Sequence, residues 1–289
     1  MTCKTGISRV IVVVIDGLRA DAIHLFPLPN FASLAERGAV TFNARTVTPS
    51  VTAAAMTSLL TGVAPQVHGL TSDRFGMPRP RTPLTPVTQA LRRAGLPSST
   101  YLAEIPRAYR GLAERIARGL GVEHASFHGE TGADVLRAAD ASLTTQRRGF
   151  ILLHWPDADR AGHEYGWSSD VYVAVTRRLD ETLGILARRI GVLGDPATLM
   201  IVCADHGGGG VDARGHDSLH PLDQRIPLML LGAGVRRGHL GPTCSLLDVP
   251  ATVCWALGVE PPATYDGRPL YQAFTVPDEP LATAVAAVA

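Results

Sequence analysis

The stretch that decides the fold is RVIVVVIDG, from Arg9 to Gly17. Between Arg9 and Asp16 the chain has six consecutive Val and Ile residues. A run that is apolar at every position is typical of a strand buried on both faces, as in a parallel sheet that helices cover. We therefore expect a central strand here, with the Asp16 carboxylate at its carboxyl end.

Three further stretches repeat this pattern: GFILLHWPD (149–157), ATLMIVCADHG (197–207) and RIPLMLLGAG (225–234). Segments with helical periodicity separate them, and we predict helices within residues 85–95, 109–120, 131–143 and 172–191. Strands that alternate with helices in this way indicate an α/β sandwich.

The composition is that of a globular protein. Hydrophobic residues make up 46% of the 289 residues, which is enough for a sizeable core. We expect one domain over residues 1–289, with a surface loop from Arg74 to Pro86 and a flexible Ala-rich tail over 276–289. The chain has 27 Lys and Arg against 26 Asp and Glu, so neither a nucleic-acid polymer nor a membrane is an expected partner. The sequence predicts no particular oligomeric state.

The N-terminal apolar run is far too short to span a membrane. The four cysteines, Cys3, Cys203, Cys244 and Cys254, show no CxxC spacing. We therefore expect a cytoplasmic protein, in which Cys203 is a small buried side chain.

Acids and imidazoles follow three of the four predicted strands. Asp16 ends the first, Asp157 and Asp159 follow the second, and Asp205 with His206 ends the third. In an open α/β sheet, ligands bind at the carboxyl ends of the strands, so we expect these side chains at one edge. A lone acid in such a place is often only a helix N-cap, which is the simpler explanation of Asp16 by itself.

Two more histidines extend this pattern. His163 follows Asp159 in the spacing D-x-x-G-H, and His216 lies in the loop after Asp205 and His206. Carboxylates and imidazoles together suit zinc or manganese better than calcium, which prefers oxygen ligands. Two divalent ions among three carboxylates and three neutral imidazoles would leave one net positive charge. Such a site would attract an anion and could activate a nucleophile.

A candidate nucleophile lies in TPSVTAAAMTSLL, residues 48–60. Thr52 directly precedes an alanine-rich helical segment, and Pro49 fixes the chain shortly before it. Free N–H groups at a helix N-terminus favour a bound phosphate. The residues alone leave open the alternative that Thr52 or Ser50 merely caps the helix.

Taken together, these stretches resemble the alkaline phosphatase superfamily, and most closely its type I phosphodiesterase/nucleotide pyrophosphatase branch. The resemblance runs from about Arg9 to Leu270, in the family's order. Its stretches are VVVIDGLRAD, TPSVTAAAMTSLLTGVAPQVHGL, DADRAGHEYGW, ADHGGGG with GHD, RIPLMLLGAGV and SLLDVPATVCWALGVEPPATYDGRPL. The D-x-x-G-H and D-H-G pieces are the most specific single motifs among them.

The resemblance implies a three-layer α/β/α sandwich with a mostly parallel central sheet, and a hydrolase that acts on small-molecule phosphate esters, most simply diesters. It also implies two divalent metal ions, zinc with manganese as the alternative, and Thr52 as a nucleophile that is transiently phosphorylated. Carried over position by position, one metal would be bound by Asp16, Thr52, Asp205 and His206, and the other by Asp159, His163 and His216. Asp157 would then support the turn rather than bind metal.

Several alternatives remain at this level. The same site would suit a phosphonate hydrolase, a phosphomonoesterase or a sulfatase, although the segment around Thr52 lacks the cysteine of the sulfatase C/S-x-P/A-x-R motif. A phosphate mutase would need room for an inserted domain, and a non-catalytic scaffold would be expected to have lost ligand residues. His220 competes with His216, but only His216 follows a glycine as in the family pattern. Where the family usually has an asparagine, three residues after the nucleophile, this chain has Ala55, so the resemblance by itself does not imply a nucleotide substrate.

Overall fold

The computed structural model of the protein describes residues 6–275 except 73–79, 81 and 242. Cys3, the tail over 276–289 and much of the Arg74–Pro86 segment therefore lie outside the described residues.

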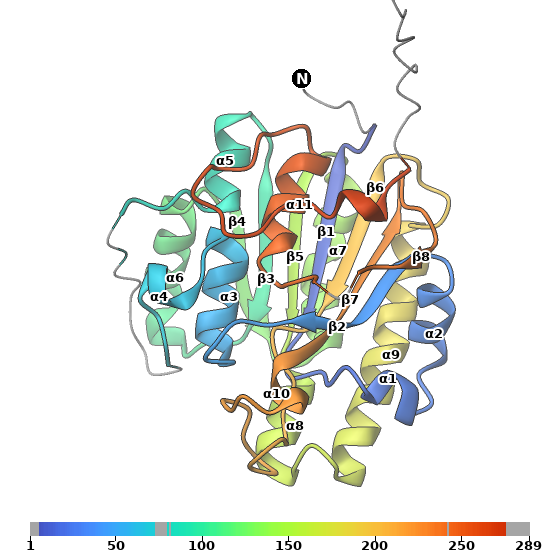
Figure 1. The fold of residues 1–289 in the computed structure, drawn as a ribbon. Coiled ribbons are helices and arrows are strands. Elements are labelled where there is room, and N and C mark those ends of the chain that lie inside the picture. The colour runs from blue at the N-terminus through green and yellow to red at the C-terminus, as the bar shows by residue number, and fades with distance from the viewer. Residues whose placement is uncertain (1–5, 73–79, 81, 242, 276–289) are drawn as a thin grey trace, which may run out of the picture.

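One eight-stranded sheet forms the middle layer of the molecule, in the order β4-β3-β5-β1-β6-β7-β2-β8 (Figure 1). Strand β1 runs parallel to β5 and β6, and β3 runs parallel to β4 and β5, whereas β7 is antiparallel to β6 and β2. The mostly parallel sheet is thus confirmed, and the fourth apolar run is its antiparallel member. The strands are β1 Arg9–Ile15, β2 Ala39–Arg45, β3 Ser98–Ala103, β4 His124–Gly129, β5 Gly149–Trp155, β6 Thr198–Cys203, β7 Arg225–Gly232 and β8 Gly238–His239.

Helices cover both faces of the sheet, as expected for a three-layer sandwich. Helices α3, α5 and α11 pack together over one face, while α2, α7, α8 and α9 form the layer on the other. The four predicted helices correspond to α5, α6, α7 and α9. The helices are α1 Ala22–Leu25, α2 Pro29–Ala35, α3 Thr52–Thr61, α4 Pro65–His68, α5 Val87–Arg93, α6 Arg107–Gly119, α7 Gly132–Thr145, α8 Asp157–Tyr165, α9 Asp170–Ile190, α10 Pro221–Gln224 and α11 Asp248–Ala256, and Tyr271–Ala273 forms one 3₁₀ turn.

The core lies on the two faces of the central strands. Every residue of β1, β5 and β6 is buried, including Cys203 as predicted. The sequence did not predict β2, β3, β4 and β8, because their polar residues interrupt the apolar pattern. No helix within the described parts of the chain combines the length and apolarity that a membrane crossing requires.

A tight approach at Gly17 joins the ends of two central strands. Gly17 follows β1 with a φ of +68°, and a Cβ there would lie 2.7 Å from Asp159 Cα at the start of α8. The backbone N–H of Asp159 donates a hydrogen bond to the Asp16 carbonyl at 2.9 Å. The glycine therefore lets the segment after β5 pack directly against the end of β1.

We predict that Gly17→Ala destabilises the protein more than Gly95→Ala. Both glycines have positive φ, +68° and +71°, but nothing lies within 4 Å of a Cβ at Gly95. An alanine at Gly95 should cost about 1–2 kcal/mol for its backbone conformation alone, and Gly17→Ala should cost at least about 1 kcal/mol more because of overpacking. Urea unfolding of the two variants measures the difference. Equal losses of unfolding free energy would contradict the close packing at Gly17.

Candidate active site

Helix α8 presents Asp159 and His163 on the same face. Their i, i+4 spacing brings His163 Nε2 to 3.4 Å from Asp159 Oδ1. The glycine between them is required by packing, because a Cβ at Gly162 would meet the buried ring of Trp167 at 2.4 Å. Asp157 faces elsewhere: its Oδ2 accepts a hydrogen bond from Gly132 N at the start of α7, at 2.7 Å. Of the two acids, Asp159 therefore faces the cluster, and Asp157 joins two helices.

Asp16 stands at the centre of the cluster. Its Oδ1 lies 3.2 Å from His206 Nε2 and 3.4 Å from Thr52 Oγ1, and Thr52 Oγ1 is itself 3.1 Å from His206 Nε2. On its other side, Asp16 Oδ2 lies 3.1 Å from His154 Nε2. Asp16 does not cap a helix, because α1 begins only at Ala22.

Asp205 is fully buried beside these groups. Its Oδ1 accepts hydrogen bonds from Gly17 N at 3.2 Å and His206 N at 2.9 Å. Its Oδ2 is buried without a hydrogen-bond partner among the described residues, and lies 3.6 Å from His206 Nε2. The Thr46 hydroxyl donates to the Asp205 carbonyl and so fixes the turn after β6. A buried carboxylate oxygen without a partner is costly, unless a cation or a water binds it.

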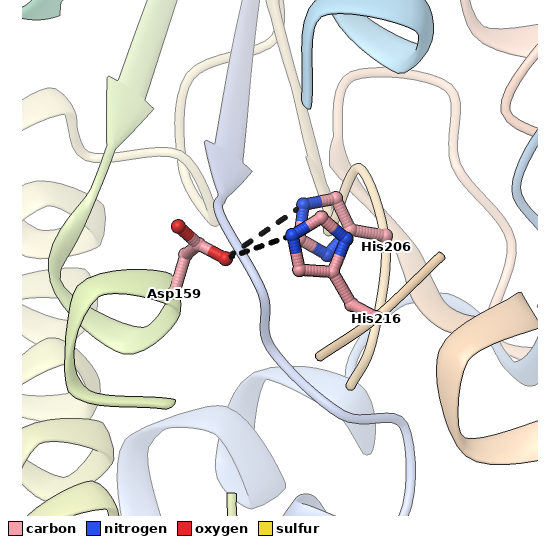
Figure 2. Close-up of side chains that lie close together, drawn as sticks. All are labelled: Asp159, His206 and His216. Carbon is pink, nitrogen blue, oxygen red and sulfur yellow. Dashed lines mark ion pairs between the residues drawn. The ribbon is translucent and has the colours of Figure 1, made fainter. Parts of the chain in front are cut away.

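Figure 2 shows Asp159, which projects from α8, opposite the stacked rings of His206 and His216. The two ring centroids are 3.8 Å apart with an interplanar angle of 11°. Asp159 Oδ1 is 3.9 Å from His206 Nε2 and 3.7 Å from His216 Nε2, and His216 Nε2 is 3.1 Å from His163 Nε2. One carboxylate oxygen thus faces the Nε2 atoms of three histidines.

A contact between Nδ1 and a backbone carbonyl orients each of the three histidine rings. His163 Nδ1 is 2.8 Å from the Arg214 carbonyl, His206 Nδ1 is 2.8 Å from that of Gly207, and His216 Nδ1 is 2.6 Å from that of Ser50. A carbonyl can only accept, so each Nδ1 must carry the proton that it donates. In the neutral ring, Nε2 is then left with a lone pair that points into the cluster.

Two groups of donors have the spacing of a metal site. Asp159, His206 and His216 form one, and Asp16, His154 and Asp205 form the other; within each group the ligand atoms lie within 4.8 Å of one another. The two groups adjoin, since His206 Nε2 also approaches Asp16. All seven residues singled out from the sequence are therefore brought together: Asp16, Thr52, Asp159, His163, Asp205, His206 and His216.

The carboxylates perturb each other strongly when no cation separates them. Burial, followed by the charge of Asp16, raises the pKa of Asp205 to about 7. Burial also disfavours the Asp16 anion, but contacts with His154 and His206 outweigh it and hold the pKa of Asp16 well below its ordinary value. Burial alone would lower the pKa of His206, yet the charges of Asp205 and Asp16 raise it to about 10. Without metal, protons on Asp205 and His206 thus offset the negative charge of the carboxylates.

The start of helix α3 shows which of the hydroxyls of Ser50 and Thr52 faces the cluster. The N-cap of α3 is Val51, and no side chain caps this helix, so neither Ser50 nor Thr52 has a capping role. Ser50 Oγ is fully buried, donates to the His216 carbonyl and accepts from Gln224 Nε2 at 3.0 Å. Thr52 is the first residue of the helix and is the hydroxyl that faces Asp16 and His206.

Three neighbouring positions lie outside the cluster. His220 caps the short helix α10, where its ring accepts a hydrogen bond from Leu222 N. Arg19 forms an ion pair with Asp21 at 2.5 Å. Ala55 is fully buried in the hydrophobic core, and nothing in the structure tests the inference about nucleotides drawn from its identity.

Sequence reasoning missed two residues of the site. His154 lies in β5, and its only sequence signal is a polar residue one position before the end of an apolar strand. Trp167 donates from Nε1 to the Gly17 carbonyl at 2.9 Å and packs edge-on against His163 and His216. The three glycines around Trp167, at 162, 208 and 209, would each clash with it if they carried a Cβ. Only the packing reveals this role.

The fold is alkaline-phosphatase-like, as comparison with solved structures shows. The chain belongs to the type I phosphodiesterase / nucleotide pyrophosphatase family, whose model matches residues 10–236. It is 30% identical over 202 residues to a phosphopentomutase from Anaeromyxobacter sp. (strain K); the match covers 68% of this chain and 45% of the mutase. The chain spans less than half the length of the curated relatives that it matches.

Two solved structures illustrate the range of proteins with this fold. An inactive variant of murine ectonucleotide pyrophosphatase/phosphodiesterase 5 in complex with AMP superposes with a TM-score of 0.70 at 15% identity, covering 93% of this chain and 100% of that chain. A phosphonate monoester hydrolase from Silicibacter pomeroyi superposes with a TM-score of 0.67 at 18% identity, covering 91% and 76%.

We predict that the EDTA-treated protein loses stability as the pH rises from 5 to 9. The pKa of Asp205 rises on folding from about 4 to about 7, and that of His206 from about 6.5 to about 10. Both groups therefore bind protons more tightly in the folded state, and the stability that they contribute is lost as the pH rises through these ranges. Urea unfolding at several pH values measures the slope.

Asp205→Asn should flatten this slope, because the amide does not titrate and no longer raises the pKa of His206. Asp217→Asn, at an exposed position beside the cluster, should leave it unchanged. A slope that is flat or rises with pH in the EDTA-treated wild type would show that the cluster does not retain protons.

Proposed function

We propose that the protein is a metal-dependent hydrolase of phosphate esters, with diesters as the preferred class and Thr52 as the nucleophile. The observation that carries this proposal is the common orientation of three imidazoles around buried carboxylates. His163, His206 and His216 each donate Nδ1–H to a backbone carbonyl and aim Nε2 at the acids. Family membership supports the same chemistry.

The donor set fits two divalent cations. Asp16, Asp159 and Asp205 lie side by side, and the partnerless Oδ2 of Asp205 is the kind of buried atom that a cation would satisfy. Two divalent ions beside three carboxylates leave the centre positive, which suits an anionic substrate. The mixture of oxygen and imidazole nitrogen favours zinc, with manganese as the alternative.

We assign His206 to the ion bound by Asp16, Thr52 and Asp205. His206 Nε2 is closer to Thr52, Asp16 and Asp205, at 3.1, 3.2 and 3.6 Å, than to Asp159 at 3.9 Å. Asp159, His163 and His216 would then bind the second ion. His154 would hold Asp16 through its other carboxylate oxygen, as outer residues commonly do for metal ligands.

Bound divalent ions supply positive charge that favours ionisation of a nearby hydroxyl and offsets charge that develops on the phosphoryl oxygens. The residues of the chain provide the nucleophile and its position. Thr52 Oγ1 attacks phosphorus, a bond forms between them, and the bond to the leaving alcohol breaks. The phosphorus, now bonded to Thr52 and still carrying the second ester group of a diester, is then attacked by water, which releases the phosphate monoester and restores the Thr52 hydroxyl. Because Thr52 is the first residue of α3, a phosphoryl group bonded to it would lie at the N-terminus of that helix, whose positive end favours an anion.

Hydrolysis of phosphonate esters is the second candidate, because a phosphonate monoester hydrolase shares the fold. A panel of nitrophenyl substrates, namely a diester, a monoester, a phosphonate monoester and a sulfate, assayed with Zn²⁺ and with Mn²⁺, separates these activities. The diester should give the highest kcat/KM. Turnover of none of the four by the metal-loaded protein would exclude the proposed function.

We predict that Thr52→Ala abolishes turnover while the metals remain bound. Removal of a covalent nucleophile should lower kcat by at least about a thousandfold, whereas the carboxylates and imidazoles stay in place. Steady-state kinetics on the diester and metal analysis by mass spectrometry provide the two measurements. Ser50→Ala, which removes a buried hydroxyl in contact with the His216 loop, is the matched control and should retain far more activity.

Turnover of Thr52→Ala near the wild-type rate would rule out this nucleophile. Acid quenching of the wild type during turnover should in addition trap phosphate on Thr52, and mass spectrometry of the peptide locates it.

We predict that His216→Ala lowers the metal content by about one ion per chain, while His220→Ala does not. His216 Nε2 faces Asp159 and His163, whereas His220 caps α10. Metal analysis of the two purified variants is the measurement. Loss of an ion in His220→Ala together with full occupancy in His216→Ala would reverse the assignment.

A further inference from the structure

An apolar cavity of about 380 Å³ lies beside the candidate active site, between the sheet and helices α3, α5 and α6. Met56 and Leu60 of α3 line it on one side, and Leu152 and His154 of β5 form part of its floor. Helix α6 closes it with Ala113, Ile116, Ala117 and Leu120, which follow the i, i+3, i+4, i+7 spacing of one helical face. The apolar face of α6 therefore lines this cavity as well as packing against β4.

The cavity reaches the proposed nucleophile through two elements. Met56 lies one helical turn after Thr52, on the same side of α3. His154 lines the cavity, and its Nε2 is 3.1 Å from Asp16, which in turn contacts Thr52. A phosphoryl group at Thr52 would thus have this cavity next to it.

Two of the polar side chains that line the cavity already face other protein groups. Thr88 Oγ1 donates to the Leu120 carbonyl at 2.6 Å, and His154 Nε2 faces Asp16. Thr100 is a buried residue of β3, and no Lys, Arg, Asp or Glu is among the described lining residues. A nucleoside would bring hydroxyls and ring nitrogens into this apolar space, and each polar group buried there without a hydrogen bond would weaken binding.

We propose that this cavity binds an uncharged apolar substituent of the substrate, an alkyl chain or an aryl ring on the phosphoryl group. The inference rests on the proposed function, since it names the class of ester that the site would select. The volume is near the lower end for ligand pockets, which suits one such substituent. Because each buried methylene contributes up to about fourfold in affinity, longer chains should bind more tightly until the cavity is full.

The test measures binding of methyl-, butyl-, octyl- and phenylphosphonate to the Zn²⁺-loaded protein by isothermal titration calorimetry. Each of these ligands carries a single substituent, so the cavity and the phosphoryl site are probed together without ambiguity of orientation. We expect Kd to fall at least about tenfold from methyl to octyl. Thymidine 5′-monophosphate should bind no more tightly than methylphosphonate. Affinity that is independent of chain length, or that is highest for the nucleotide, would overturn the inference.

Ala117→Phe is designed to fill the cavity from α6, where Ala117 is buried. This substitution should abolish the increase in affinity with alkyl chain length and leave the affinity for methylphosphonate unchanged. Ala108→Phe, on an exposed position of the same helix, is the matched control and should retain the gain. If Ala117→Phe fails to fold by circular dichroism, Leu120→Trp at the exposed rim makes the same test. A gain that persists in the filled variant would mean that the chains bind elsewhere.

The outcome is separable from that of the proposed function. If the panel of esters shows no hydrolysis but Kd depends on chain length, the cavity assignment holds and the catalytic proposal fails. If esters are hydrolysed while Kd does not depend on chain length, the catalytic proposal holds and the cavity assignment fails.

Discussion

The hydrogen bond from Asp159 N to the Asp16 carbonyl is the contact on which the site depends. It ties the start of α8 to the end of β1, so that two acids 143 positions apart in the chain share one edge of the sheet. The contact forms only because Gly17 has no side chain, and the Gly17 carbonyl in turn accepts from Trp167 Nε1 and Tyr172 Oη, both at 2.9 Å. One short backbone segment thereby sets the positions of α8 and α9.

Backbone carbonyls fix the imidazoles in the same way. His216 is held against the Ser50 carbonyl while the Ser50 hydroxyl donates to the His216 carbonyl, so the loop after β6 is tied to the segment before α3 in both directions. Asp223 braces that loop further, because its carboxylate accepts from Gly210 N and Ser218 N. The ring orientations of the three histidines are thus decided by backbone contacts, which are more rigid than contacts between side chains. Such a cluster is preorganised before any ion or substrate arrives.

Helix α3 and strand β5 each contribute residues both to the polar cluster and to the apolar cavity. The first residue of α3 faces Asp16 and His206, while residues one and two turns later line an apolar cavity. Along β5, Leu152 and His154 share one face, and the histidine closes the cavity at the side of the acids. The surroundings change from charged to apolar because of strand and helix periodicity. Residues on one face of α3 or β5 lie at increasing distance from the sheet edge that carries the acids.

The sequence by itself determined the central strands, the four helices α5, α6, α7 and α9, and the seven residues of the cluster, because apolar runs and the D-x-x-G-H and D-H-G spacings are local signals. It left open whether Thr52 and Ser50 cap a helix, because the direction of a side chain depends on where its helix packs. Strands β3 and β4, the contact of His154 with Asp16 and the place of Trp167 were decided only by the tertiary structure. Their roles come from residues that are distant in the chain and adjacent in space, and a pattern along one segment carries no record of which other segment will pack against it.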